Sequence, residues 1–293
     1  MSLLESGDST GEVSLSSLFA GNSLPITRVE DNTLKRIAFL TCRGGWPDAI
    51  GRAENVALRT AFNYVDAVTQ LDISRVDGVS RNPQTAALLL QSYARLIASQ
   101  GSFATMRADI NSGGLEIAES TFLDYVQALR KLFVIDDLAA WSPNLRSNTA
   151  IRTSPTRHFG DPSIAVAALG AGPNELINDL ETFGLIFEDL CIRDLRTYME
   201  SLDGAVYHYR DKSGLEADAV LRMRNGNYAL VEIKLGGDKL IDEGAATLSA
   251  LEKRIDTTRM PEPAFKMVLT GVGDFSYVRE DGVFVVPIRA LGN

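Results

Sequence analysis

Two short apolar runs separated by an Asn-Gly-Asn turn constrain the fold of this chain most strongly. Residues 217–223 and 228–235 have the composition of strands, and Asn225-Gly226-Asn227 between them is typical of a hairpin turn. Asp218 lies at the start of the first strand, and Glu232 and Lys234 lie near the end of the second. Because side chains alternate along a strand, Glu232 and Lys234 share one face of the sheet.

The length of the turn decides whether Asp218 joins these two residues. A two-residue loop, Asn225-Gly226, pairs Asp218 with Ile233 and sends its carboxylate to the opposite face. A three-residue loop, residues 225–227, pairs Asp218 with Lys234, so that all three polar side chains converge. We expect the three-residue loop, because glycine suits the left-handed position of a bulged turn.

Two carboxylates on one face repel each other unless a cation lies between them. Mg²⁺ or Mn²⁺ bound by Asp218 and Glu232 would activate a water for attack on a phosphodiester, and Lys234 would stabilise the developing charge. Glu188, at the edge of the apolar stripe of a preceding helix, is predicted as a fourth member and a third metal ligand. The alternative is an ordinary solvent-facing strand that carries Asp and Glu-x-Lys as surface charges.

The last third of the chain alternates helices and strands, which predicts an α/β domain with a mixed sheet. The apolar positions from Phe183 to Tyr198 indicate an amphipathic helix, and a second helix is expected over residues 242–255. The expected strands cover residues 205–210, 217–223, 228–235, 265–270 and 282–287.

The middle of the chain predicts a winged helix-turn-helix. Asn82-Pro83 is typical of a helix start, and helices are expected over residues 83–99, 104–111 and 118–133. Two short strands near residues 134–139 and 152–159 would form the wing. The expected domains are therefore residues 1–80, a remnant with a linker helix, then the winged helix at 81–169 and the sheet domain at 170–293. The expected class is α+β followed by α/β.

Several side chains in this region admit two interpretations. The helix at 118–133 lies in the recognition position, but Glu119 and Asp124 leave contact with a protein as plausible as contact with DNA. Arg146, Arg152 and Arg157 could touch phosphate or could be solvated surface charges.

The remaining chemically distinctive side chains are predicted to be structural. A partly buried strand position is expected for His208 and His158, packing roles for Trp46 and Trp141, and a core position for Cys191.

Composition limits the possible partners. The chain carries a net charge of −9, and residues 170–293 alone carry 14 basic and 21 acidic side chains. Binding to phosphate depends on Lys and Arg, so any nucleic-acid binding should be weak, and a protein partner is the alternative. Two widely separated cysteines exclude a disulfide framework and favour the cytoplasm. No apolar stretch is long enough for a membrane span.

Three passages, Arg43 to Ala49, Asn82 to Phe133 and Gly214 to Lys234, resemble the C-terminal part of bacterial and archaeal AAA-type ATPases that carry domain-of-unknown-function family 4143. The last passage is also similar to the PD-(D/E)XK nuclease superfamily. The resemblance implies a P-loop ATPase, then a winged helix, then a restriction-endonuclease-like domain. It also implies that residues 13–41 end the ATPase module.

The chain departs from that family because it lacks the G-x-x-x-x-G-K-[ST] phosphate loop. Gly236-Gly237-Asp238-Lys239 does not have the required spacing. We therefore expect an expressed fragment or a truncated chain, with ATP bound only by the missing N-terminal domain. The predicted function is a metal-dependent nuclease coupled to an ATPase in the parent protein. The alternative is an inactive nuclease fold plus winged helix that binds DNA or a protein.

Overall fold

The computed structural model describes residues 1–143, 153–258 and 260–293, and the chain divides into two compact units. One unit, which we call the sheet unit, comprises Met1–Ile37, Leu138–Pro155 and Leu190–Asn293. The other, the helical unit, comprises Ala38–Asp137 and Thr156–Asp189. These units cut across the three predicted segments, and the division at residues 80 and 169 stays a prediction.

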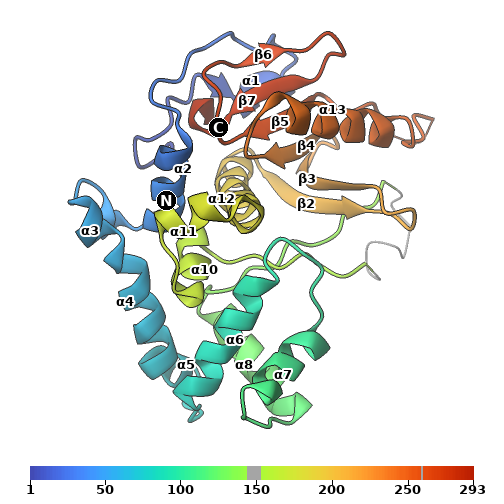
Figure 1. Ribbon diagram of the computed structural model, residues 1–293. Coiled ribbons are helices and arrows are strands. Elements are labelled where there is room, and N and C mark those ends of the chain that lie inside the picture. Colours follow the sequence, from blue (N-terminus) through green and yellow to red (C-terminus); the bar gives the residue numbers. More distant parts are fainter. Residues whose placement is uncertain (144–152, 259) are drawn as a thin grey trace. The chain divides into compact units, whose positions relative to one another are not determined.

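A mixed six-stranded sheet forms the centre of the sheet unit, with strand order β2-β3-β4-β5-β7-β6 among the described residues (Figure 1). The strands are β2 (Gly204–Arg210), β3 (Glu216–Met223), β4 (Tyr228–Lys234), β5 (Lys266–Thr270), β6 (Tyr277–Val278) and β7 (Phe284–Pro287). The pairs β4–β5 and β5–β7 are parallel, and the other neighbours are antiparallel. The expected mixed α/β arrangement is confirmed.

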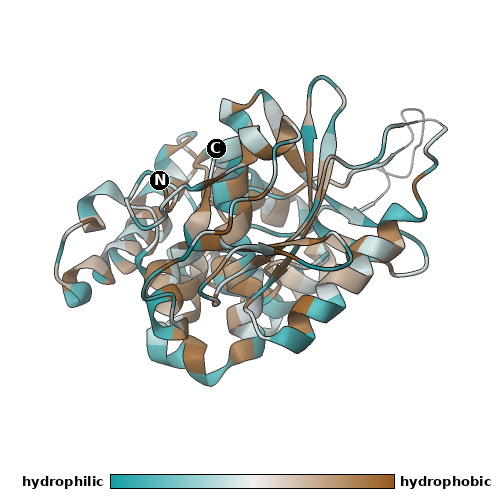
Figure 2. Cartoon of the chain, turned by 90° about the horizontal axis from the view of Figure 1, so that it is seen from above, coloured by the Kyte–Doolittle hydropathy of each residue, from teal (hydrophilic) through white to brown (hydrophobic). Residues whose placement is uncertain are grey.

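Both faces of the sheet are covered, which explains why the central strand β4 is an almost unbroken buried run. Helix α13 (Asp238–Glu252) connects β4 to the parallel β5 and buries Ile241, Leu248 and Leu251 against one face. The other face meets the end of α12 (Leu180–Ser201), where Met199 lies against Gly204. Apolar residues accordingly gather along the strands, whereas the loops are mostly hydrophilic (Figure 2).

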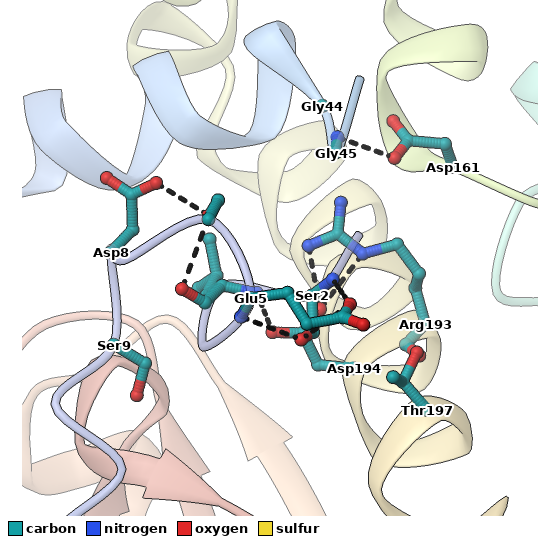
Figure 3. A network of polar contacts seen from close by, with 12 residues as sticks. Ser2, Glu5, Asp8, Ser9, Gly44, Gly45, Asp161, Arg193, Asp194 and Thr197 are labelled. Carbon is teal, nitrogen blue, oxygen red and sulfur yellow. Dashed lines mark hydrogen bonds and ion pairs between the residues drawn. The ribbon is translucent and has the colours of Figure 1, made fainter. Parts of the chain in front are cut away.

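The N-terminal segment is an integral part of the sheet unit. Strand β1 (Val13–Ser14) pairs in parallel with β8 (Leu291–Gly292). The Leu3 backbone N–H donates to Asp194 Oδ2 at 2.9 Å, and Arg193 donates to Asp194 Oδ1 through Nε at 2.9 Å and Nη2 at 2.7 Å (Figure 3). The short helix α1 (Leu15–Phe19) follows. Buried residues and a buried ion pair therefore hold a stretch that its Ser/Gly-rich composition does not identify as structured.

The helical unit is built around α10 (Pro162–Leu169), which packs against α6 and α4. Its other elements are η1 (Pro47–Ala49), α3 (Glu54–Ala57), α4 (Arg59–Ala67), the π turn η2 (Val68–Asp72), α5 (Ile73–Arg75), α6 (Pro83–Arg95), α7 (Phe103–Ser112), α8 (Glu119–Lys131) and α11 (Pro173–Asn178). Two further helices, α2 (Leu34–Arg43) and α12, have their residues divided between the two units. A last short helix, η3 (Ile288–Ala290), belongs to the sheet unit.

The predicted helices of the winged region are present, and the described residues of the predicted wing form isolated β-bridges rather than continuous strands. The Asn82 side chain accepts from the N–H groups of Gln84 and Thr85 and begins α6 as expected. In the described parts of residues 134–139 and 152–159, bridge residues lie at positions 135, 138, 156 and 159, and Ile135 pairs with Phe159 in the antiparallel sense, but no continuous strand forms. The winged-helix assignment stays a prediction.

In the described part of the chain, no helix is long and apolar enough to cross a membrane.

Candidate active site

The hairpin turn brings Asp218, Glu232 and Lys234 to one face of the sheet. Strand β3 pairs with β4 in the register Ala219↔Val231 and Arg222↔Tyr228, which leaves a loop of odd length. The Gly226 N–H donates to the Met223 carbonyl at 3.1 Å, and Gly226 has φ +96°, as in a bulged three-residue turn.

The loop is displaced by one residue from the predicted position. It consists of residues 224–226 rather than 225–227, because Met223 closes the turn by donating to the Asn227 carbonyl at 2.8 Å. Continuing the register by one residue places Asp218 beside Glu232 rather than beside Lys234. The parity, and therefore the shared face, is unchanged.

The three side chains are in direct contact. Lys234 Nζ lies 2.6 Å from Glu232 Oε2 and 3.2 Å from Asp218 Oδ2. The Asp218 carboxylate also accepts the Ile233 N–H at 2.7 Å, beyond the last β3–β4 pair, Ala219↔Val231. Asp218 is therefore fixed by the backbone of the strand that carries the other two residues.

Burial makes this cluster electrostatically unusual. Glu232 is only 4% exposed, and its Oε1 has no hydrogen-bond partner among the described residues. Burial, reinforced by the negative charge of Asp218, raises the pKa of Glu232 to about 8, although the Lys234 ammonium opposes this. For Lys234, burial lowers the pKa, but the two carboxylates outweigh it and raise the pKa above its ordinary value.

Helix α13 packs closely against the cluster at Gly244, a residue that was not among the predicted site residues. A Cβ atom at Gly244 would lie 3.3 Å from the Glu232 Cβ, 3.3 Å from Val268 Cγ2 and 3.6 Å from Lys234 Cε. Glycine therefore lets the helix approach the two site residues closely. The signal available in the sequence was a glycine inside an otherwise amphipathic helix.

The fourth predicted residue lies in the other compact unit. Glu188 is half-buried on α12 and belongs to the helical unit, whereas the other three belong to the sheet unit. Its part in the site stays a prediction. The described residues contain no group of three or more His, Cys, Asp and Glu side chains arranged to hold a metal ion.

The two histidines lie in the interior as expected. His208 is 3% exposed on β2, and His158 is fully buried beside Asp189, with Nδ1 and Oδ1 2.8 Å apart. Cys191 is also a core residue.

Neither predicted role of Arg157, a phosphate contact or a solvated surface charge, matches the structure. It is buried, donates to Asp137 at 2.7 Å and stacks on the Phe103 ring at 4.4 Å, because a buried guanidinium needs a fixed acceptor. Arg146 and Arg152 lie outside the described residues.

The Arg43 to Ala49 passage has a structural role in the helical unit. The Asp161 carboxylate accepts the Gly45 N–H at 2.8 Å through Oδ2 (Figure 3), and it accepts the Ser163 N–H at 3.0 Å through Oδ1. Trp46 Nε1 donates to Ser163 Oγ at 2.8 Å. A Cβ at Gly44 would lie 2.3 Å from Asp161 Oδ1, so glycine is required.

Two family models match the chain, and both describe domains of unknown function. Residues 34–175 match DUF8612, and residues 183–291 match DUF4143. No curated protein and no solved structure matches the chain. The resemblance to family 4143 is therefore confirmed for residues 183–291, whereas the Arg43 and Asn82 passages fall within a different family's match.

Proposed function

We propose that Asp218, Glu232 and Lys234 form a divalent-metal-dependent phosphodiesterase site in a PD-(D/E)XK-like sheet domain. The observation that carries the proposal is the buried Glu232 carboxylate, which has an unused oxygen and faces a second carboxylate across the hairpin. Leaving a buried acceptor unsatisfied costs about 1–3 kcal/mol, so such a group is more often kept for binding than for stability.

The donor set fits Mg²⁺ or Mn²⁺, since these ions accept one or two carboxylates and complete their shell with water. Asp218 and Glu232 would hold the ion, which when bound lowers the pKa of a water and polarises a phosphoryl oxygen. Lys234 would then be released from its present carboxylate contacts. Its ammonium could stabilise the charge that develops on the phosphate.

The second candidate function is a nuclease fold that binds nucleic acid or a protein without cleaving. The contacts of Lys234 favour it, because its ammonium lies within 3.2 Å of both carboxylates and already supplies the cation they require. In that case Lys234 and the two carboxylates form a complete set of ion pairs, and a metal ion would have to compete with the Lys234 ammonium for Asp218 and Glu232.

The wider context is proposed from family resemblance and element order. Family DUF4143 is associated with AAA ATPases, and we propose that the parent protein couples this site to ATP hydrolysis in another domain. Helices α6, α7 and α8 follow one another as in a helix-turn-helix, and we propose that they form a winged-helix-like module with the Ile135–Phe159 bridge.

Calorimetric titration of Mn²⁺ into the purified chain tests the metal site. Asp218→Ala should weaken binding at least tenfold, since one of two carboxylate ligands is lost. Lys234→Ala should bind Mn²⁺ as tightly or more tightly, because the competing ammonium is gone, while cleavage of a labelled oligonucleotide falls. The matched control is Glu262→Ala, which removes an exposed carboxylate from the same unit.

If wild-type protein shows no saturable Mn²⁺ binding up to millimolar concentrations, the phosphodiesterase proposal fails and the binding module replaces it. Equal affinities for wild type, Asp218→Ala and Glu262→Ala would also reject the site.

A further inference from the structure

A polar hollow lies on the sheet unit, at the end of the β2–β3 ribbon where Gly204 pairs with Met223, away from the turn that connects the two strands. Its volume is about 360 Å³, and it is lined by Gly204, Ala205, Tyr207, Arg222, Met223 and Arg224. Neither the family matches nor the carboxylate cluster accounts for it.

Strand register brings the main side chains of the hollow to one face of the ribbon. On β2, Ala205 is opposite Arg222 and Tyr207 is opposite Val220, so Ala205, Tyr207 and Arg222 share a face. Gly204 and Met223, which are opposite each other, complete the hollow at the end of the two strands.

Two polar side chains in the hollow, Arg222 and Tyr207, have no polar partner among the described residues. No described carboxylate lies within ion-pair distance of the half-buried Arg222, and no described atom bonds to the Tyr207 hydroxyl. Arg224 pairs with Asp203 at 2.9 Å, but both side chains are largely exposed, so that pair is weak.

These groups match the chemistry of a nucleic-acid strand. A guanidinium with no carboxylate partner can bind phosphate through two parallel hydrogen bonds. Tyr207 next to it is partly buried against the core, and the part of its ring that lines the hollow offers a surface on which a base can stack. The acidic charge of the chain makes an unpaired arginine in a hollow more informative than one on a basic surface.

We propose that this hollow is a contact for a single-stranded nucleic acid, in which Arg222 binds a backbone phosphate and Tyr207 stacks with a base. The inference rests on the proposed phosphodiesterase function, because a nuclease needs a contact that holds its substrate strand in addition to the site that cleaves it.

Fluorescence anisotropy with a labelled single-stranded oligodeoxythymidine tests the proposal. Measurements in EDTA at low ionic strength separate strand binding from metal binding and from cleavage. Arg222→Ala should weaken binding about tenfold, since a charge-assisted hydrogen bond to phosphate is lost. The slope of log affinity against log salt should fall by about 0.7, as expected for one lost phosphate contact on a single strand.

Three further variants sharpen the test. Lys253→Ala removes an exposed cation elsewhere in the sheet unit and should leave both affinity and slope near the wild-type values. Tyr207→Ala should weaken binding about tenfold, whereas Tyr207→Phe keeps the ring and should not. Asp218→Ala should bind the strand at least as tightly as wild type, because a repelling charge is removed.

Equal effects of Arg222→Ala and Lys253→Ala would overturn the proposal, and so would a duplex that binds as tightly as the single strand. Strand binding that depends on Arg222 in a chain that binds no Mn²⁺ would support the hollow and reject the metal site, so the two failures are distinguishable.

Discussion

Glu232 in the sheet unit and Asp161 in the helical unit are both buried carboxylates, 4% and 7% exposed, with opposite surroundings. Asp161 accepts two backbone N–H groups and a serine hydroxyl, so both of its oxygens are used. Glu232 has one oxygen on a lysine and one without a partner among the described residues.

This difference separates a carboxylate that stabilises the fold from one that is available for chemistry. Neutral donors fixed by the backbone satisfy a buried charge at little cost, and that is the role of Asp161. An acid that keeps an unused oxygen and a raised pKa destabilises its own unit and is a candidate for binding.

The largest effect should come from disturbing the satisfied carboxylate. Gly44→Ala should reduce the free energy of unfolding by about 4 kcal/mol, because its Cβ would meet Asp161 and Ser163 at a left-handed backbone position. Gly51→Ala has a similar φ of +73° but no atom within 4 Å, and it should cost only about 1–2 kcal/mol. Urea unfolding followed by circular dichroism measures both. Equal losses would mean that the contact with Asp161 is unimportant.

An isosteric amide at Asp161 should destabilise the protein by about 1–3 kcal/mol. In Asp161→Asn, one carbonyl oxygen remains to accept hydrogen bonds from Gly45 and Ser163. The NH₂ group that replaces the other oxygen is itself a donor, so at least one of these hydrogen bonds is lost. Thermal unfolding at neutral pH measures the loss. An unchanged midpoint would show that the carboxylate is not needed there.

The same amide at Glu232 should have the opposite sign. Because its pKa in the folded protein is raised to about 8, stability is full below the pKa of the unfolded chain and falls as pH rises through about 8. Glu232→Gln should therefore stabilise the protein by about 2 kcal/mol at about pH 9 and flatten the pH dependence. Urea unfolding from about pH 5 to about pH 9 tests this. Parallel pH curves for the two proteins would contradict it.

The smallest effect should come from two glycines in helices. Gly184→Ala on α12 meets no atom within 4 Å and should stabilise the protein by about 0.5–1 kcal/mol through helix propensity. Gly244→Ala gains the same propensity but crowds Glu232 and Val268 at 3.3 Å, so the net change should lie near zero. Comparing the two thermal midpoints isolates the contact. A gain at Gly244 equal to that at Gly184 would show that α13 has room to move away from the site.

The strands and helices around the site were largely predictable because their signals are local. Two apolar runs on either side of the Asn-Gly-Asn turn located β3 and β4, and Asn82-Pro83 located the start of α6. The extent of strand pairing in the predicted wing could not be read from the sequence, since Ile135 and Phe159 are distant in the chain and pair only as an isolated bridge. The N-terminal segment was missed for the same reason: β1 has two residues and exists only beside β8.

Sequence alone determined the residue types of the site and the odd parity of the turn, because side-chain alternation and the glycine of the Asn-Gly-Asn turn act over a few residues. It left the turn one residue out of place, since local preference does not distinguish neighbouring loop positions. Tertiary structure decided the rest. Only the close approach of α13 at Gly244 buries Glu232, and only the hairpin register brings the Lys234 ammonium against both carboxylates. Burial and charge contacts arise from residues distant in the chain, and they set the protonation of the site.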